Sequence, residues 1–345
     1  PRTSNNIFES LVEKYLETPQ TFQRYVAELS FSDPTMQAIA KDVMQSPDYR
    51  ITSKTLCDRY SLSQEQFEEY ILQLEFHFVC CLVYEKQGDE WTEVVTLFQE
   101  WKDYLSFLKE TKPQAIESLG SIHRTRPRDF SFVEDMSTIL RLLTEETPLA
   151  VTGDGVLTRE ARLVAAEACG SFVLSEQGDE RLRSYFAHLI DKLLTLRLVS
   201  VENGLLHMRH EAHEWLSLPI EKRALSSYKA TLTLYDFSDF PKDICSERNI
   251  HEIEKSIGRV IDSGWVYFDD FMKGVIAPIS EESKMTLKKS GKHWQYTPPN
   301  YTDDEKELIR LVILEWLFEA GVVATGSHNG RTCFMVTPLG QSMFG

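Results

Sequence analysis

The chain has 345 residues, of which 42% are hydrophobic and 26% charged. This composition excludes a disordered, collagen-like or low-complexity protein, and the length predicts two or three domains. The 37 lysines and arginines against 53 aspartates and glutamates give a net charge of −16. That charge excludes a general electrostatic binder of nucleic acid, because phosphate binding needs clustered cations.

Six cysteines occur without any Cys-x-x-Cys pair, and Cys80 and Cys81 are neighbours in an apolar run. This usage predicts free thiols in a reducing, cytoplasmic setting. The first residues contain no apolar signal core, and the longest apolar stretch, Phe76–Tyr84, is far shorter than the roughly 20 residues of a membrane helix. We therefore expect no membrane partner.

An N-terminal helical segment, residues 1–32, is followed by a first structural copy at residues 33–112. A helix is predicted to begin at Asp33, and Ser63 with Gln66 forms a predicted capping box for a later helix. The other predicted elements of this copy are a short strand at Ile51–Ser53, a short helix at Lys54–Tyr60, strands at Phe76–Tyr84 and Trp91–Leu97, and a closing helix.

A basic linker, residues 113–129, precedes a second copy at 130–235 and a third copy at 236–345. The second copy is predicted to contain a helix from Phe130, a short strand at Pro148–Thr152, helices at Thr158–Ala168 and Arg181–Leu196, and a hairpin of Leu198–Val201 with Leu205–Met208. The third is predicted to contain helices at Ile250–Ile261, Phe268–Val275 and Asp303–Ala320, a short strand at Trp265–Tyr267, and a hairpin of Val322–Thr325 with Arg331–Thr337. A long basic loop, 278–302, interrupts the third copy, and loops of that length are often functional.

All three copies share one order of elements, which is helix, short strand, helix, helix and hairpin. This order is typical of a winged helix, a helix-turn-helix followed by a β-hairpin wing. We therefore predict an α+β fold, mostly α, made of tandem winged-helix domains. An irregular α+β protein without a repeat is the alternative.

Short segments of the second and third copies resemble the tandem winged-helix regions that precede or accompany XPB-type and related bacterial helicases. These segments are Pro148–Thr152 with Gly155–Arg159, Glu214–Pro219, Gly264–Phe271 and Val336–Gly340. The resemblance covers roughly residues 130–345, and most of the residues that carry it are packing and turn residues. The resemblance implies an N-terminal or accessory region of a helicase rather than its motor.

The sequence contains no motif of a catalytic motor or a metal site. No G-x-x-x-x-G-K-[ST] phosphate loop is present, and no G-x-S-x-G nucleophile elbow is present. His207, His210 and His213 do not follow the H-E-x-x-H pattern of a zinc-binding helix. We expect a non-enzymatic protein without cofactor or metal, which works with a helicase, a remodelling ATPase or the transcription machinery.

The strongest acidic bias lies in the first copy, where residues 51–100 carry ten acids and three cations. Glu65, Glu68 and Glu69 fall on its third predicted helix, which in a winged helix would face DNA. Because these carboxylates would repel phosphates, the pattern predicts docking of a basic protein surface there.

Two basic clusters and one mixed helix are candidates for local contact with nucleic acid. The candidates are Arg124, Arg126 and Arg128 in the linker, Arg181 and Arg183 in the second copy, and Lys288, Lys289, Lys292 and Trp294 in the long loop. Cations beside aromatic rings can hold phosphates while the rings stack on bases. A solvated linker and a solvated loop are the alternative interpretation.

Three functions stay open. The favoured one is a tandem winged-helix accessory or regulatory module of a DNA- or transcription-associated assembly, which acts mainly by protein docking. The second is an acidic structural subunit of a chromosome-condensing complex, which would dimerise. The third is a DNA-binding transcriptional regulator, in which the lysines of the long loop would carry much of the DNA contact.

Overall fold

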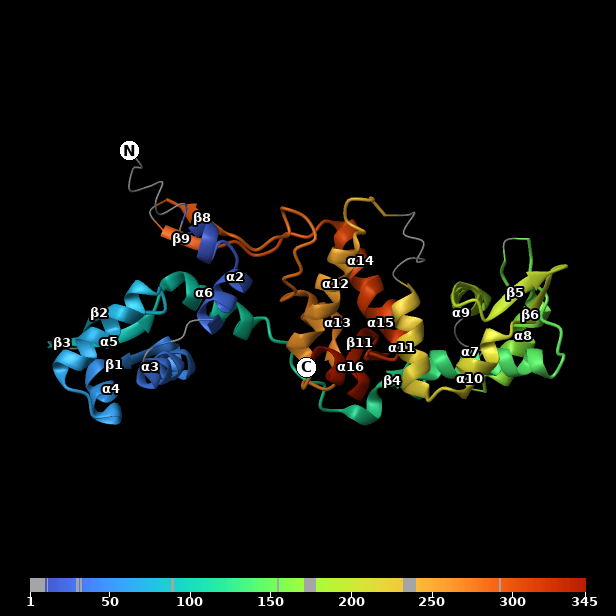
Figure 1. Cartoon of the computed structure of the whole chain (residues 1–345), viewed down its shortest axis with the longest axis horizontal. Coiled ribbons are helices and arrows are strands. Elements are labelled where there is room, and N and C mark those ends of the chain that lie inside the picture. The colour runs from blue at the N-terminus through green and yellow to red at the C-terminus, as the bar shows by residue number, and fades with distance from the viewer. Residues whose placement is uncertain are drawn as a thin grey trace. The chain divides into compact units, whose positions relative to one another are not determined.

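The computed structural model shows a chain that folds into two compact units. The described residues are 10, 12–28, 31, 33–87, 90–153, 155–170, 178–231, 240–291 and 293–345. The first unit comprises residues 1–111 with 282–300, and the second comprises residues 112–281 with 301–345 (Figure 1). Both are mostly helical with small antiparallel sheets, so the predicted α+β class is confirmed.

The first unit combines a helical N-terminus, the first copy and a hairpin from the third copy. Its helices are a π-helical turn η1 (Val12–Leu16), α2 (Pro19–Glu28), α3 (Pro34–Gln45), a 3₁₀ turn η2 (Pro47–Tyr49), α4 (Ser53–Tyr60), α5 (Gln64–Phe76) and α6 (Gln99–Glu110). Its strands are β1 (Arg50–Thr52), β2 (Cys80–Gln87), β3 (Glu90–Leu97), β8 (Leu287–Ser290) and β9 (His293–Tyr296). β3 lies between β1 and β2 in an antiparallel sheet, and α5 packs beside β2.

Helix α5 begins where the sequence predicts. The Ser63 side chain accepts a hydrogen bond from the backbone N–H of Gln66, and the Gln66 side chain accepts one from the backbone N–H of Ser63. These two bonds complete the predicted capping box. Phe67, Ile71 and Leu74 then recur on one side of the helix and are buried.

Replacing Ser63 by alanine should lower the free energy of unfolding of the first unit by about 1 kcal/mol, because the N–H of Gln66 loses its acceptor. Urea denaturation followed by circular dichroism measures the change. Lys54 is exposed on the neighbouring helix α4 and provides the matched control. An equal loss in Lys54→Ala would contradict the role of the cap.

The first strand of the hairpin begins later than predicted. The sequence predicts a strand from Phe76, whereas α5 continues through Phe76 and β2 begins at Cys80. Phe78 adopts a left-handed backbone conformation, with φ of 56°, and turns the chain between helix and strand. The apolar run Phe76–Tyr84 therefore contains the end of α5 and the start of β2.

The long loop predicted in the third copy contains a β-hairpin that belongs to the first unit. The Leu287 N–H donates to the Glu17 carbonyl oxygen (2.8 Å), and Lys284 Nζ lies 3.0 Å from the Glu17 carboxylate. The Tyr296 hydroxyl donates to the Leu16 carbonyl oxygen (2.9 Å). These bonds hold β8 and β9 against the N-terminal turn, so this segment is structured.

The second unit contains the second and third copies and the segment before them. Its first elements are the 3₁₀ turn η3 (Leu119–Ser121), β4 (His123–Arg124), α7 (Ser131–Thr144), α8 (Arg159–Ala168), α9 (Gly178–Thr195), β5 (Val199–Glu202), β6 (Leu205–Met208), α10 (Glu211–Ser217) and α11 (Ile220–Thr231). Its later elements are α12 (Glu247–Lys255), η4 (Ser256–Val260), β7 (Val266–Tyr267), α13 (Phe268–Met272), α14 (Asp303–Leu311), η5 (Val312–Trp316), α15 (Leu317–Glu319), β10 (Val323–His328), β11 (Arg331–Val336) and α16 (Pro338–Phe344). Each copy has its own apolar core.

In all three copies the short first strand pairs with the second strand of the later hairpin. In the first unit β1 pairs with β3, and in the third copy β7 pairs with β11. In the second copy Ala150 forms an isolated antiparallel bridge to Leu205 of β6. The Asn203-Gly204 turn between β5 and β6 has positive φ at both residues, which is the geometry of a type I′ turn.

The segment predicted as a basic linker, 113–129, is part of the second unit. His123 and Arg124 form β4, which pairs with β10 in a four-stranded sheet of order β4-β10-β11-β7. The N–H of Ile116 donates to the Trp265 carbonyl oxygen (2.8 Å), and both side chains are buried in one cluster. We expected a linker here, but tertiary pairing makes the segment an edge of the sheet.

The cysteines carry free thiols, as the sequence predicts. Cys80 is fully buried, and burial raises the pKa of its thiol to about 12. Across the described ranges of the chain, no helix is both long and apolar enough to cross a membrane.

Candidate functional site

One side of α5 carries carboxylates followed by exposed apolar side chains. Glu65, Glu68 and Glu69 are exposed. Leu72 and Phe76 continue the same helical side, and 67% and 78% of their surfaces are exposed. We term this surface, together with two residues of the β2–β3 hairpin, the acidic–aromatic face; it consists of Glu65, Glu68, Glu69, Leu72, Phe76, Tyr84 and Trp91.

The β2–β3 hairpin extends this face with two exposed rings. Tyr84 lies opposite Glu93 and Trp91 lies opposite Lys86, so the four side chains share one side of the hairpin. The Tyr84 hydroxyl donates to the Glu93 carboxylate (3.1 Å). This hydrogen bond raises the pKa of Tyr84, and the charge of Glu68 adds to the effect. The acids of α5 therefore lie near enough to the hairpin to act on Tyr84.

The carboxylates of the acidic–aromatic face are not neutralised by cations. The Gln64 amide donates to Glu68 (2.8 Å), and the Gln73 amide donates to Glu69 (3.5 Å). Within the described ranges, neither these two glutamates nor Glu65 forms an ion pair with a lysine or arginine. The face therefore presents negative charge beside apolar side chains, which complements a basic amphipathic surface.

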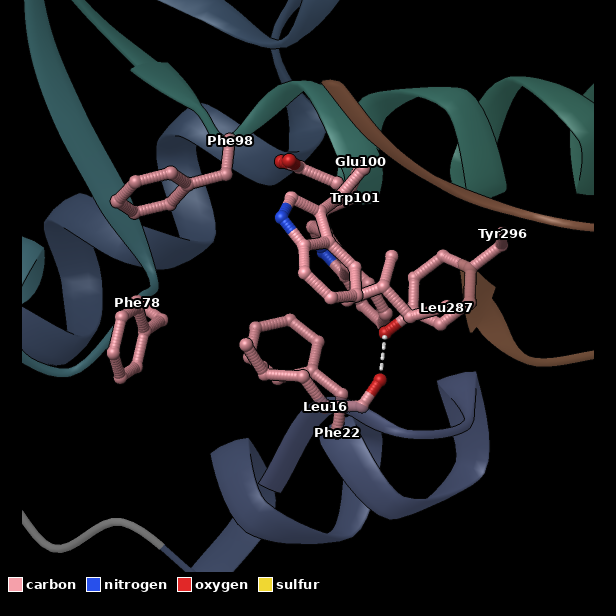
Figure 2. A pocket seen from close by; sticks show the side chains of 9 residues that line it. Leu16, Phe22, Phe78, Phe98, Glu100, Trp101, Leu287 and Tyr296 are labelled. Carbon is pink, nitrogen blue, oxygen red and sulfur yellow. Dashed lines mark hydrogen bonds between the residues drawn. The ribbon is translucent and has the colours of Figure 1, made fainter. Parts of the chain in front are cut away.

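A second feature of the first unit is a cavity of about 250 Å³, which we term the aromatic pocket (Figure 2). Its walls come from three parts of the sequence: the N-terminal helices, the segments flanking the β2–β3 hairpin, and the β8–β9 hairpin. The lining residues are Leu16, Phe22, Phe78, Phe98, Glu100, Trp101, Leu287, Trp294 and Tyr296.

Aromatic pairs form two walls of this pocket. Phe22 meets Trp101 edge to face, with ring centroids 4.5 Å apart. Phe78 and Phe98 form a tilted pair with ring centroids 6.3 Å apart (Figure 2). The hydrogen bond from the β8–β9 hairpin to the N-terminal turn is dashed in Figure 2. Neither pair is stacked face to face, so ring faces are left for a ligand.

Two polar groups of the aromatic pocket have no hydrogen-bond partner among the described residues. The Trp101 indole N–H is buried, and no acceptor lies within hydrogen-bond distance in the described part of the chain. The Glu100 side chain lines the pocket (Figure 2) and forms no hydrogen bond or ion pair with a described residue. A buried donor without an acceptor costs about 1–3 kcal/mol. The pocket therefore offers one donor and one acceptor to a ligand.

Arg126 is unavailable to a nucleic acid, contrary to expectation. Its side chain is 4% exposed, and its guanidinium donates twice to Asp135 of α7, at 2.8 and 2.6 Å. The hydroxyl of Tyr185 on α9 donates to the same carboxylate. The guanidinium stays charged when it is buried, and it therefore needs a buried acid beside it. That acid, Asp135, lies outside the predicted linker, so the linker sequence does not reveal the burial of Arg126.

The other two arginines of this segment are also paired. Arg124 forms an ion pair with Asp129, and its guanidinium lies 5.8 Å from the ring centre of Trp265. Arg128 lies 3.0 Å from Glu134, and 74% of its side chain is exposed. Of the three predicted cations, Arg128 is therefore the most accessible.

Arginines from three segments of the second unit line a polar cavity of about 560 Å³. Arg126 and Arg128 line it from the segment before α7, Arg141 from α7 and Arg223 from α11. Burial, followed by the charge of Arg141, lowers the pKa of Arg223. Arg141 has no basic neighbour in the sequence and Arg223 has only Lys222 beside it, so no cluster of arginines marks them.

Three of the candidate cations on α9 and on the long loop are exposed, and the side chains of the other two lie outside the described residues. The Arg181 side chain and Lys292 lie outside the described residues, and Arg183 is exposed on α9. Lys288 and Lys289 are exposed on β8.

Trp294 does not lie on an open stacking surface beside the loop lysines, because it lines the aromatic pocket. It pairs with Lys289 across the hairpin, which places Lys289 on the pocket side of the strands. Lys288 points to the opposite side.

Sequence reasoning identified one part of the aromatic pocket and missed the others. The sequence marks Trp294 as a candidate, and Tyr296, which also lines the pocket, lies two residues along the same polar loop. Phe22 and Trp101 have the spacing of ordinary core residues, and nothing distinguishes Glu100 in the sequence. The available signal was a pair of aromatic residues inside a polar insertion, which suggests that the insertion packs on something.

Comparison of the chain with protein-family models, with curated proteins and with solved structures finds no match. The resemblance of the second and third copies to helicase-associated regions therefore stays a prediction. The function has to be inferred from the surfaces of the chain itself.

Proposed function

We propose that the chain is a non-catalytic array of winged-helix domains that works as an accessory or regulatory module in a DNA- or transcription-associated assembly. The repeated order of helices and strands supports this fold, since three separate segments pair the short first strand with the second strand of the hairpin. In this proposal the module acts mainly by docking a protein.

The acidic–aromatic face carries the functional proposal. In a helix-turn-helix domain the second helix of the motif enters the major groove and reads bases through cationic and amide side chains. In the first copy that helix is α5, whose exposed side presents Glu65, Glu68 and Glu69 and no lysine or arginine. Phosphates would be repelled there. A basic partner would be attracted, and Leu72 and Phe76 would supply apolar anchors.

The corresponding helix of the third copy also favours protein contact over DNA contact. On α14 the two cations bind acids of their own segment: Lys306 Nζ lies 3.1 Å from Asp303. The Arg310 guanidinium lies 2.6 Å from Glu307 and 3.0 Å from Glu315. A phosphate would have to displace these carboxylates, so α14 is a poor DNA reader.

The partner that we propose is a basic amphipathic segment of a helicase or remodelling ATPase. Charge complementarity to the acidic–aromatic face supports a basic partner. The exposed rings on the same face support an amphipathic one, because interface anchors are usually aromatic or apolar side chains in a polar rim. The helicase association comes from the resemblance of the second and third copies.

The triple variant E65Q/E68Q/E69Q should bind a basic amphipathic peptide about tenfold more weakly than the unmodified chain. Three surface ion pairs worth roughly 0.5 kcal/mol each would be lost. The measurement is fluorescence anisotropy of a labelled helical peptide with lysines and arginines on one side and leucines on the other. The loss should shrink as salt is added, because surface charges are screened.

The matched control is E145Q/E146Q, which removes two exposed acids of the second unit. This variant should bind the peptide like the unmodified chain. An equal loss in the control would show attraction to the net charge rather than docking. A labelled DNA duplex that binds more tightly than the peptide, and that binds more weakly to a K288E/K289E variant, would support the DNA-binding alternative instead.

A further inference from the structure

We propose that the aromatic pocket binds a guanine nucleotide, with the base between the rings and the phosphate at Lys289. The pocket has about 250 Å³, which is below the roughly 300–1,000 Å³ of most small-molecule sites. A cavity of this size suits one flat ring system. Aromatic walls stack on the faces of nucleobases.

The two unpartnered polar groups of the pocket select among the bases. A carboxylate such as Glu100 accepts hydrogen bonds and needs donors in front of it. Guanine presents two adjacent donors, N1–H and the N2 amino group, which match the two oxygens of one carboxylate. Adenine and cytosine present an amino donor beside a ring acceptor, and uracil presents one donor between two acceptors. Glu100 would repel these acceptors, so guanine fits it best.

The Trp101 indole N–H fits the same base. Guanine carries acceptors at O6 and N7, and O6 lies next to the N1–H edge. A guanine whose donors face Glu100 can therefore offer an acceptor to Trp101, the neighbouring residue on α6. Binding would satisfy a donor that is buried without a partner in the free protein.

The β8–β9 hairpin supplies a cation for the phosphate. Leu287 and Tyr296 form one cross-strand pair, and Lys289 and Trp294 form the pair two residues along on the same side. Lys289 is exposed and forms no ion pair with a described residue. Because its cross-strand partner Trp294 lines the pocket, Lys289 lies on the pocket side of the hairpin.

A purely cationic ligand satisfies fewer of these groups. An ammonium or guanidinium would pair with Glu100, but Lys289 would repel it and the Trp101 N–H would keep no acceptor. A nucleotide satisfies all three groups, since it carries donors, an acceptor and a negative charge. This site is separate from the proposed docking of a basic protein on α5 and does not depend on it.

The test is a titration of the full chain with guanosine monophosphate, guanosine, adenosine monophosphate and uridine monophosphate, followed by tryptophan fluorescence. Trp101 and Trp294 line the pocket, so an occupied pocket quenches them. Guanosine monophosphate should quench saturably and bind about tenfold more tightly than the adenosine and uridine nucleotides, because two hydrogen bonds to a carboxylate are at stake. No saturable quenching, or equal binding of the guanosine and uridine nucleotides, would overturn the proposal.

Two pairs of variants locate the contacts. Glu100→Gln should remove most of the preference for guanine, whereas Glu110→Gln, an exposed acid at the far end of the same helix, should leave it unchanged. Lys289→Gln should weaken the nucleotide but not the nucleoside, and Lys288→Gln, on the opposite side of the hairpin, should weaken neither. Thermal melting of each variant checks that the unit stays folded. Equal effects within either pair would contradict the assignment.

The last arm distinguishes a free nucleotide from an unpaired base in a strand. A single-stranded oligothymidine with one central guanosine competes with guanosine monophosphate for the pocket if the ligand is a strand. If this oligonucleotide binds more tightly than guanosine monophosphate, the ligand is single-stranded nucleic acid. If it does not compete, the ligand is the free nucleotide. Competition by oligothymidine without guanosine would overturn the guanine assignment.

Discussion

Replacing Asp135 by alanine should lower the free energy of unfolding of the second unit by about 3–5 kcal/mol. Arg126 would stay buried and charged, since a guanidinium cannot release its proton near neutral pH. The Tyr185 hydroxyl would lose its acceptor as well. Urea denaturation followed by circular dichroism measures the loss, and hydrogen exchange of the α7 and α9 amides locates it.

The triple variant R126M/D135L/Y185F is the control for this expectation. Apolar replacement of a whole buried pair is often neutral, whereas removal of one partner leaves an unpaired charge. The triple variant should therefore recover most of the stability lost in Asp135→Ala. Failure to recover would indicate that these residues stabilise the fold through packing rather than through their charges.

The single variant Arg126→Met adds a pH test. Burial raises the pKa of Asp135, although the charge of Arg126 opposes the shift. Without the arginine the carboxyl has a folded-state pKa still further above its unfolded value. Such an acid contributes stability at low pH and loses it as the pH rises through the folded-state pKa. Arg126→Met should therefore be more stable near pH 5 than near pH 8, and Asp135→Ala should not show this trend.

Local signals in the sequence were sufficient for the elements of each copy. The Ser63–Gln66 capping box and the spacing of Phe67, Ile71 and Leu74 lie within eleven or so residues of one another, and they determine where α5 begins and which side is buried. The end of the helix was missed. Its apolar residues continue into the strand without a break in composition, and the turn between them depends on a left-handed backbone conformation that apolar residues rarely adopt.

Burial of charged residues could not be predicted because it depends on distant partners. Arg126 looks like its neighbours Arg124 and Arg128 in the sequence. It differs from them because Asp135 and Tyr185, on two different helices, place a carboxylate in the core beside it. Pairs of this kind follow from the tertiary packing of the second unit and leave no local pattern.

The candidate surfaces were predicted in part for the same reason. Helical spacing correctly placed Glu65, Glu68 and Glu69 on an exposed side of α5. The apolar run predicts a strand that includes Phe76, so the sequence does not predict the apolar part of that face. The aromatic pocket needs the β8–β9 hairpin, which lies far along the chain from both α2 and α6. No local pattern in either helix indicates that contact.

The buried pair of Lys192 and Glu319 provides the second large effect, because it joins the second copy to the third. Lys192 Nζ on α9 lies 3.3 Å from the Glu319 carboxylate on α15, and the two side chains are 7% and 6% exposed. Burial lowers the pKa of Lys192 and raises the pKa of Glu319, while each charge opposes the shift of the other. Glu319→Gln and Lys192→Met should each cost about 3–5 kcal/mol, since each leaves a buried charge without its partner.

The two variants should respond to pH in opposite directions. In Glu319→Gln the lysine is a base whose folded-state pKa lies below its unfolded value. Its neutral form favours the folded state, so stability is lost as the pH falls through the folded-state pKa and is regained as the pH rises toward about 10. In Lys192→Met the glutamate is an acid with a raised folded-state pKa. Its contribution is present at low pH and is lost as the pH rises.

His188 sharpens the test for the second variant. Its Nδ1 lies 3.7 Å from the Glu319 carboxylate, so the imidazole stays beside that carboxylate when Lys192 is replaced. The double variant Lys192→Met/His188→Gln separates this contribution from protonation of Glu319 itself. Urea denaturation at about pH 5, 7 and 9.5 gives the comparison. Parallel pH trends in the two single variants would contradict a charge pair. Opposite trends would mean that the second and third copies are joined by a compensated pair of buried charges, so that a partner which separates the copies would have to neutralise or rehydrate both.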